Sequence, residues 1–361
     1  MAYPDNYGAA TAAFVAAAEA AGATIERHAH PAARAPDDAP LDIVVAALGE
    51  RHAPRMLLSI SGTHGLEACS GSAAQTRFLE GRPAFPAGTG ALIVHCLNPY
   101  GFAWRSRANE DFVDLSRNFI ADWSAPPANP YYGEIHPLLT AAEWQDNTEE
   151  RLYQAIAQLT TAHGPREALT GLTGGQYDHP DGLSFGGDGT SWSRRVFEDV
   201  CGRWLSHARR IAYVDFHTGF GAFGQPFFVC LHPEGSAERD RVESWWGPMN
   251  RNADAFGIGA EPDWQGLLWD GLRRWILPDA EICGSVIEFG TYPLPRVARA
   301  LMIDRWLRFG QEDAGWRDAL RAEMVEAFAP PAADWRTAVT TRGCAVLDAA
   351  LTGLARWQPA A

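Results

Sequence analysis

The chain has 361 residues, of which 47% are hydrophobic, and its formal net charge is −14. That apolar content can fill a large core, which excludes a disordered chain. Nucleic-acid binding normally needs a basic face, and the acidic balance and the lack of a dense Lys/Arg cluster argue against such a partner. No apolar run reaches the roughly 18 residues of a membrane span, so we expect no membrane partner.

The N-terminal stretch MAYPDNYGAATAAFVAAAEAAG lacks the basic start and long apolar segment of a secretory signal. The six cysteines are scattered and form no CxxC pair. In a chain of this length, that distribution suggests buried free thiols in a reducing compartment. We therefore expect a cytoplasmic protein, and the sequence leaves the oligomeric state open.

The predicted elements begin with an Ala-rich helix over 8–22. Short apolar runs bounded by Gly or Pro predict strands, and longer runs with helical spacing predict helices. The strands are expected at 41–49, 55–62, 90–99, 208–219, 226–232 and 283–293. Further helices are expected at about 70–80, 147–164, 191–208, 296–309, 316–328 and 342–357.

Two stretches between these elements carry no clear period. Residues 120–150 are rich in Pro, Asn and Trp and are interpreted as a long excursion, and residues 174–193 form a Gly-dense loop. Loops of that length are usually functional or disordered. The alternation of strands and helices predicts an α/β fold with a mixed, mostly parallel central sheet flanked by helices. No repeat or Ser/Gly linker divides the chain, so we expect one domain over 1–361 with loop insertions at about 120–190.

Polar residues follow three of the predicted strands. His64 and Glu67 stand in THGLE, His217 in VDFHTG and Glu288 in SVIEFGTYP. The carboxyl ends of parallel strands are where α/β sheets bind ligands, so these ends can share one cleft. Two His and one Glu are a ligand set of catalytic zinc, and Glu288 is a candidate base for water activated there. Each signal alone is weak, because a lone strand-end His is more often structural; the combination carries the prediction.

The segment NPYGFAWRSRANEDFVDLSRNF at 98–119 strengthens this interpretation. With HGLE before it and DFHTG and IEFG after it, the chain resembles the zinc carboxypeptidase superfamily. That superfamily includes carboxypeptidase A, the succinylglutamate desuccinylases and the aspartoacylases. The closest resemblance is to an uncharacterised carboxypeptidase-like branch with GTHGxE, NPYGFAW, RxNED and HPDG segments. The motifs span about residues 55–295 and imply a zinc-carboxypeptidase-like, phosphorylase/hydrolase-like fold.

The resemblance implies one zinc ion per chain, held by His64, Glu67 and His217, with Glu288 as the general base. It implies that Arg105 or Arg107 polarises the scissile carbonyl, and Arg107 is favoured because RAN matches the RxN of the branch. Asp215 precedes the ligand His217 by two positions and lies on the same side of the strand, where a supporting role and a structural role are equally plausible.

The resemblance also implies substrate contacts. Arg117 would bind a substrate carboxylate through its planar guanidinium. Ser116 stands where the family has Asn and reaches less far. Tyr177 and His179 of the Gly-dense loop, together with Asp181, are candidates to line the cleft. Tyr292, which follows the base, is a candidate donor to substrate, although packing is the simpler explanation for such an aromatic residue.

The sequence thus predicts a zinc metallohydrolase. Its substrate would be a small peptide or an N-acyl amino acid that carries a carboxylate, cleaved at an amide bond by zinc-activated water. Two alternatives stay open: an esterase or deacylase that acts on a non-peptide substrate, and a non-catalytic binding protein on the same scaffold. The joint presence of three ligands and a base favours the enzyme, because a degenerate binding protein should have lost at least one of them.

Overall fold

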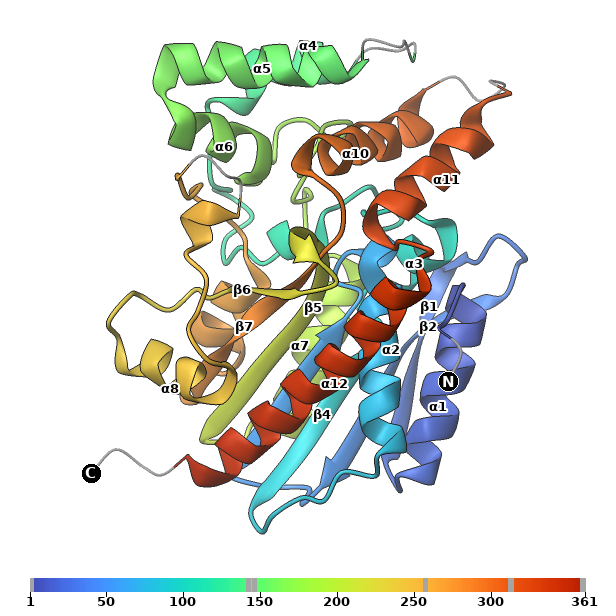
Figure 1. The fold of residues 1–361 in the computed structure, drawn as a ribbon, viewed down its shortest axis with the longest axis vertical. Coiled ribbons are helices and arrows are strands. Elements are labelled where there is room, and N and C mark those ends of the chain that lie inside the picture. Colours follow the sequence, from blue (N-terminus) through green and yellow to red (C-terminus); the bar gives the residue numbers. More distant parts are fainter. Residues whose placement is uncertain (1–2, 141–143, 145–147, 256–258, 311–314, 358–361) are drawn as a thin grey trace.

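The computed structural model describes residues 3–140, 144, 148–255, 259–310 and 315–357. Within them, seven strands form one sheet in the order β1-β2-β4-β3-β5-β7-β6 (Figure 1). The strands are β1 (Thr24–Arg34), β2 (Pro40–Gly49), β3 (Arg55–Ser61), β4 (Thr89–His95), β5 (Arg210–Phe223), β6 (Pro226–Val229) and β7 (Glu281–Gly290).

The centre of the sheet is parallel and its margins are antiparallel. Strands β4, β3, β5 and β7 pair in parallel, whereas β2 pairs antiparallel with β4, β1 with β2, and β6 with β7. The predicted α/β class with a mixed sheet is confirmed. Because β3, β5 and β7 run in one direction, the segments that leave their carboxyl ends meet at one edge of the sheet.

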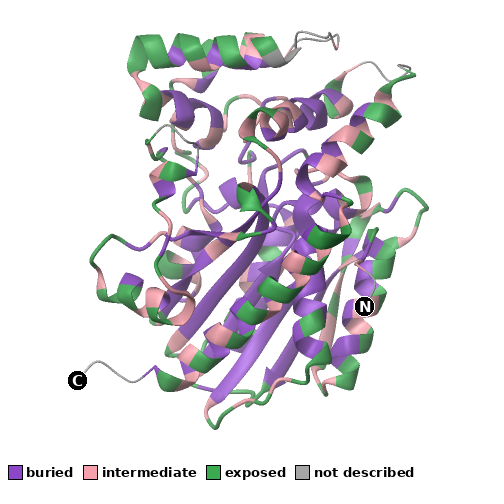
Figure 2. Cartoon of the chain, viewed as in Figure 1, coloured by how far each residue is buried: buried purple, intermediate pink, exposed green. Residues whose placement is uncertain are grey.

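The central strands are continuous apolar runs because both of their faces are covered. In β3, every residue after Arg55 is buried, and all of β4 is buried (Figure 2). The edge strand β1 is largely exposed or half-buried instead. Its sequence accordingly lacks the apolar character that marks a strand, which is why this element was not predicted.

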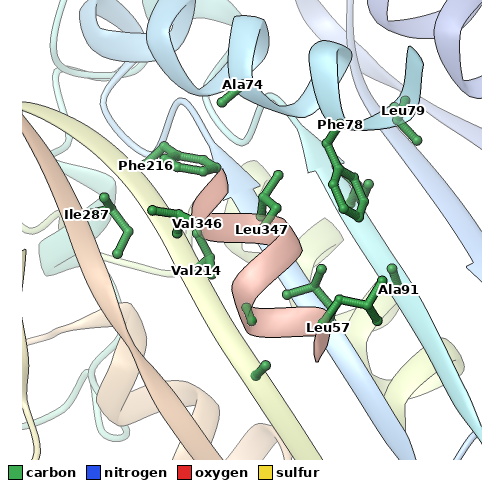
Figure 3. Packing of buried hydrophobic residues seen from close by; sticks show 14 of the residues in the cluster. Leu57, Ala74, Phe78, Leu79, Ala91, Val214, Phe216, Ile287, Val346 and Leu347 are labelled. Carbon is green, nitrogen blue, oxygen red and sulfur yellow. The ribbon is translucent and has the colours of Figure 1, made fainter. Parts of the chain in front are cut away.

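One face of the sheet is covered by α1 (Tyr7–Ala20), α2 (Ala68–Glu80), α8 (Ala237–Trp246) and α12 (Ala333–Arg356). Figure 3 shows Val346 and Leu347 of α12 lying among side chains of the sheet and of α2. The opposite face packs against α7 (Trp192–Leu205), the short helix α9 (Leu268–Gly271) and the π-helical turn Leu272–Ile276. His217 and Glu288 lie on β-strand positions that alternate onto this second face.

A group of helices lies beyond the carboxyl ends of the parallel strands (Figure 1). We call it the cap, and it consists of α4 (Tyr132–Leu139), α5 (Thr148–His163), α6 (Pro165–Thr173), α10 (Leu294–Phe309) and α11 (Arg317–Phe328). Leu66, between the two predicted ligands of the THGLE segment, belongs to the apolar cluster of α10 and α11. Met302 of α10 joins the cluster formed by α4, α5 and α6. The cap is therefore packed directly onto the loop that follows β3.

The remaining short elements are α3 (Pro99–Trp104) and the 3₁₀ turns Gly65–Glu67, Leu115–Arg117 and Asn252–Asp254. Across the described residues, no helix combines the length and the apolar character required to cross a bilayer. All six cysteines are free thiols, and five of them are buried.

Candidate metal centre and active site

The THGLE loop owes its shape to a close contact between two glycines. A Cβ on Gly65 would lie 2.1 Å from the carbonyl carbon of Gly101, so a side chain has no room at this position. Gly101 belongs to NPYG, where the Asn98 side chain accepts a hydrogen bond from its amide at 2.8 Å. The Gly65 amide in turn donates to the carbonyl oxygen of Arg107 at 3.2 Å. The two motifs thus fold as one unit that holds His64 and Glu67 at the end of β3.

The three predicted ligands converge in the structure. Their ligand atoms lie within 4.8 Å of one another, and all three residues are buried. His64 Nδ1 lies 2.9 Å from Glu67 Oε1 and 3.1 Å from His217 Nδ1. Glu67 Oε2 lies 3.2 Å from His217 Nδ1 and accepts a hydrogen bond from the Thr218 amide at 3.0 Å. Each imidazole therefore turns its Nδ1 to the common centre.

The opposite nitrogen of each imidazole contacts a carboxylate. His64 Nε2 lies 3.1 Å from Asp114 Oδ1 and 2.9 Å from Ser116 Oγ. His217 Nε2 lies 3.1 Å from Asp215 Oδ2. A carboxylate at Nε2 fixes the ring orientation and favours the proton on that nitrogen, which leaves Nδ1 free to bind a metal.

The carboxylate of Asp215 is itself held by hydroxyl groups. Thr63 Oγ1 donates to its Oδ1 at 2.9 Å, and the Tyr213 hydroxyl donates to its Oδ2 at 3.2 Å. Asp215 thus contacts the predicted ligand His217 from the side that faces away from the centre. Asp114, which sits in the VDLSRNF segment, had been assigned no role from the sequence; the only signal was an acidic residue next to Ser116 and Arg117.

The electrostatics of the site favour a charged carboxylate among the ligands. Burial raises the pKa of Glu67, but the two imidazoles outweigh burial and lower that pKa below its usual range. Burial likewise raises the pKa of Asp114, and the charge of Arg107 then holds it well below its ordinary value. For His217, burial lowers the pKa, but Asp215 and Glu67 raise it well above 6.5. Carboxylates thus surround both imidazoles, an arrangement that a cation at the centre would complement.

Glu288 lies beside this centre on the neighbouring strand. It pairs directly with His217 in the parallel register of β5 and β7. Its Oε2 is buried and has no hydrogen-bond partner in the described part of the chain. Burial, reinforced by the charge of Glu67, raises its pKa from 4.5 to about 8. A divalent cation held by the three ligands would oppose that effect and lower the pKa again.

The two candidate arginines lie in different places. Arg107 Nη1 donates to Asp114 Oδ2 at 2.5 Å, and its Nε lies 3.9 Å from Glu67 Oε1, with about a fifth of the side chain exposed. Arg105 instead adopts a left-handed backbone conformation with φ of 59°, and its guanidinium donates to the carbonyl of Asp5. This placement favours Arg107 as the arginine of the site.

Asp304 of α10 was also missed from the sequence. Its Oδ2 accepts from the Arg107 amide at 2.8 Å and from Ser106 Oγ at 3.2 Å. Burial raises its pKa to about 6, and these hydrogen bonds partly oppose the increase. Asp304 thereby links the backbone at Arg107 to helix α10 of the cap. Such a contact across the fold leaves no local sequence pattern.

The predicted substrate-binding residues have partners within the chain. Ser116 Oγ donates to Asp114 Oδ1 at 2.7 Å in addition to its contact with His64. The Arg117 guanidinium donates to the Thr173 carbonyl, from Nε at 3.0 Å and from Nη2 at 2.8 Å. The Tyr177 hydroxyl donates to the carbonyl of Arg117 at 2.7 Å. Ser116 therefore touches a predicted metal ligand, while Arg117 and Tyr177 connect the same turn to the Gly-dense loop and α6.

The remaining candidates also have defined surroundings. The His179 ring stacks on His136 with 4.1 Å between ring centroids. Asp181 accepts from His136 Nε2 at 2.9 Å and pairs with Arg305 at 2.8 Å. The Tyr292 hydroxyl donates to Glu326 at 3.0 Å. These contacts are with the cap helices, and none of the three residues contacts a predicted metal ligand among the described interactions.

The donor set fits a zinc ion. Two imidazole nitrogens and one carboxylate are the ligands of many catalytic zinc sites, where a fourth position stays open. Here three such donors are preorganised, and each imidazole is oriented by a carboxylate. The buried Oε2 of Glu288, which lacks a partner within the described chain, borders the same space. The residues present can therefore hold the metal that the resemblance implied.

Similar solved structures are metallocarboxypeptidases and a desuccinylase. Carboxypeptidase A from Helicoverpa armigera is 11% identical, with 94% of this chain and 73% of that chain covered and a TM-score of 0.43. A metallo-carboxypeptidase from Burkholderia cenocepacia is 13% identical over 95% of this chain and 68% of that chain, with a TM-score of 0.37. A succinylglutamate desuccinylase from Silicibacter sp. TM1040 is 15% identical over 80% of this chain and 67% of that chain, with a TM-score of 0.39.

The sequence itself was compared with curated proteins and with family models. No curated protein matches it. One family model, described as "Protein of unknown function (DUF2817)", matches residues 3–342, which is nearly the whole chain. The protein therefore belongs to the DUF2817 family.

Proposed function

We propose that this protein is a zinc-dependent hydrolase that cleaves an amide bond. The observation that supports the proposal best is the convergence of His64, Glu67 and His217 on one buried point, with Glu288 beside them on the adjacent strand. A purely structural cluster would have no need for two imidazoles that turn the same nitrogen inward. The resemblance to carboxypeptidases and desuccinylases supports a small peptide or an N-acyl amino acid as substrate.

Zinc held by the three ligands would supply Lewis acidity to a carbonyl oxygen and to water. The side chains of the protein would handle the protons and the developing charge. Glu288 Oε2 borders the site, and it would accept a proton from the water that attacks the carbonyl carbon. Arg107, the more exposed cation of the site, would face the carbonyl oxygen as negative charge builds there.

The second half of the reaction returns that proton. Glu288, now protonated, would give it to the leaving nitrogen as the C–N bond breaks, so that a carboxylic acid and an amine are released. Asp114 and Asp215 would hold the two imidazoles in place throughout, because each accepts from the nitrogen that faces away from the centre. The apolar cluster around Leu66, Val297 and Phe328 would limit the access of bulk water.

Metal analysis of protein purified without chelator tests the proposal. We expect one zinc per chain after reconstitution, and we expect His64→Ala and His217→Ala to lose the metal and the activity together. His207→Ala, at an exposed position outside the site, is the matched control and should keep both. Screening dipeptides and N-acyl amino acids with the loaded protein then identifies the substrate class. Zinc below about half occupancy after reconstitution would argue against the assignment, since sites of this kind bind zinc tightly.

A further inference from the structure

Arg117 lies in the turn that also supports the predicted metal ligand His64. The turn spans Leu115–Arg117, and its Ser116 hydroxyl lies 2.9 Å from His64 Nε2. Although arginine is rarely buried, Arg117 as a whole residue is only 8% exposed. The groups that accept hydrogen bonds from its guanidinium therefore indicate the role of Arg117.

Each of the three guanidinium nitrogens donates to a group of the protein. Nε and Nη2 both donate to the carbonyl oxygen of Thr173, and Nη1 lies 3.2 Å from the carbonyl oxygen and 3.3 Å from the hydroxyl of Ser116. Thr173 is the last residue of α6. The final carbonyls of a helix have no partner within the helix and carry partial negative charge, so a cation satisfies them well. Arg117 thus caps the carboxyl end of a cap helix.

Two glycine-containing loops close around Arg117. A Cβ on Gly266 would lie 2.1 Å from the Arg117 carbonyl oxygen, and one on Gly175 would lie 2.9 Å from its Cδ. Hydrogen bonds hold these loops in place: the Phe119 amide donates to Gly266 at 2.9 Å, and the Gln265 amide donates to the Gly174 carbonyl at 2.7 Å. One loop therefore lies against the backbone carbonyl of Arg117 and the other against its side chain.

This environment leaves little capacity to receive a substrate carboxylate. A bidentate contact needs two neighbouring N–H groups directed at the ligand. Here Arg117 would first have to leave the Thr173 carbonyl, and the loss of a charged partner from a partly buried acceptor is costly. Burial already lowers the pKa of Arg117, although the nearby Asp114 partly compensates.

We propose that Arg117 is a positioning residue that ties α6 to the turn behind His64, and that the enzyme does not anchor a free substrate carboxylate on it. The second part rests on the proposed function. If so, the protein recognises its amide substrate through groups other than a terminal carboxylate bound to Arg117. The protein would then act as an amidohydrolase with broader tolerance at this end of the substrate than a strict carboxypeptidase.

The structural role of Arg117, which links α6 to the turn at 115–117, can be tested without an assay of activity. Arg117→Met in the metal-free protein should lower the Tm by about 2–4 °C and should speed proteolytic cleavage within α4–α6. Arg274→Met is the matched control, because its side chain is 72% exposed and pairs only with Asp270 among the described contacts. If Arg117→Met yields no folded protein, Arg117→Lys keeps the charge with fewer donors and should still lower the Tm. A Tm and a rate of proteolysis equal to those of Arg274→Met would contradict this structural role of Arg117.

The substrate arm compares N-acetyl dipeptides that end in a carboxylate with the same dipeptides as carboxamides. The wild-type protein should cleave both with kcat/KM values within about threefold, and Arg117→Met should change both alike. A preference for the free acid of about tenfold or more, abolished by Arg117→Met, would show a carboxylate receptor and overturn the inference. If the wild-type protein cleaves neither series nor any other amide, the proposed function fails. The measurements of Tm and proteolysis still test the structural role of Arg117 in that case.

Discussion

The two histidines of the candidate metal site are oriented by contacts on the side of the ring that faces away from the centre. His64 and His217 present Nδ1 to the centre because Asp114 and Asp215 occupy their Nε2 sides. Glu288 differs, since its Oε2 is buried without a partner among the described residues. Under the proposed function, the first two residues hold the metal and Glu288 handles protons, and substitution can test this difference.

Glu288→Gln should separate metal binding from chemistry. The amide keeps the shape of the side chain but cannot accept a proton, so zinc should stay bound while kcat falls by about 10² or more. Metal content and turnover measured on the same preparation check this. Glu281→Gln, at the exposed start of the same strand, is the control and should turn over normally. Near-normal turnover of Glu288→Gln would remove Glu288 from the mechanism.

Another buried histidine lies outside the metal site. His95 at the end of β4 is fully buried; its Nε2 lies 2.9 Å from Ser72 Oγ and its ring stacks on Phe14. Burial lowers its pKa from 6.5 to about 3. Between these two values the unfolded chain binds a proton that the folded chain does not. The stability that His95 contributes is therefore complete above pH 6.5 and decreases as the pH falls toward 3.

We expect this histidine to give the protein part of its acid sensitivity. Between pH 7.5 and 5.5, the His95 linkage should lower the free energy of unfolding by about 1 kcal/mol. His95→Gln cannot titrate at this position. Its free energy of unfolding should therefore fall by about this amount less than that of the wild type over the same pH interval. Urea unfolding of both proteins at the two pH values gives the difference. Equal pH dependence in the two proteins would mean that His95 is protonated in the folded state.

At the scale of elements, two helices pack closely against each other on one face of the sheet. Helix α12 crosses the sheet beside α2, the helix that follows the THGLE loop (Figure 3). At Gly343 of α12, an added Cβ would lie 2.5 Å from the Cβ of Ala74 in α2. The absence of a side chain lets the two helices approach. Gly202 of α7 is exposed and would meet no atom within 4 Å, so it offers the opposite case in a helix.

The two glycines should respond oppositely to a methyl group. Gly343→Ala forces α12 away from α2 and should destabilise the protein by about 1–3 kcal/mol, the usual cost of overpacking. Gly202→Ala gains helix propensity without a clash and should stabilise it by about 0.5–1 kcal/mol. Chemical unfolding of the two variants beside the wild type measures both effects. A Gly343→Ala variant as stable as the wild type would show that the contact between α2 and α12 can relax.

For the whole molecule, the candidate metal site joins segments that are far apart in the sequence. The predicted ligands come from the loop after β3 and from β5, and Leu66 between the first two of them packs into the cluster of α10 and α11. A ligand that binds only the folded state stabilises that state by mass action. The occupancy of the site should therefore be visible in the stability of the entire chain.

Removal of the metal should lower thermal stability. Zinc at about 100 times its Kd should add about 2.7 kcal/mol, which corresponds to a rise in Tm of roughly 3–4 °C in a chain of 361 residues. Calorimetry of chelator-treated protein, with and without added zinc, measures the shift. His217→Ala should show no such rise, because it lacks one of the three ligands. An equal rise in that variant would place the zinc elsewhere.

Much of the architecture follows from the sequence alone. Apolar runs bounded by Gly or Pro mark β2 to β7, and helical periods mark α1, α2, α5, α7, α10 and α11, because burial on one or both faces imposes a local pattern. The three ligands and Glu288 stand at strand ends, where chain order already places them at one edge of a parallel sheet. Residue type and position along the chain therefore predict that these four side chains lie close together.

The tertiary structure alone decided the features that depend on contacts between distant segments. The edge strand β1 forms because β2 supplies its hydrogen bonds, while its own exposed residues show no strand pattern. The antiparallel direction of β2 and β6 depends on how the chain returns, which composition does not encode. The partner of Arg117 is the Thr173 carbonyl, 56 residues away. A backbone carbonyl is the same group at every position, so a sequence cannot say which one a buried cation will meet; only the packing of α6 against the turn at 115–117 decides it.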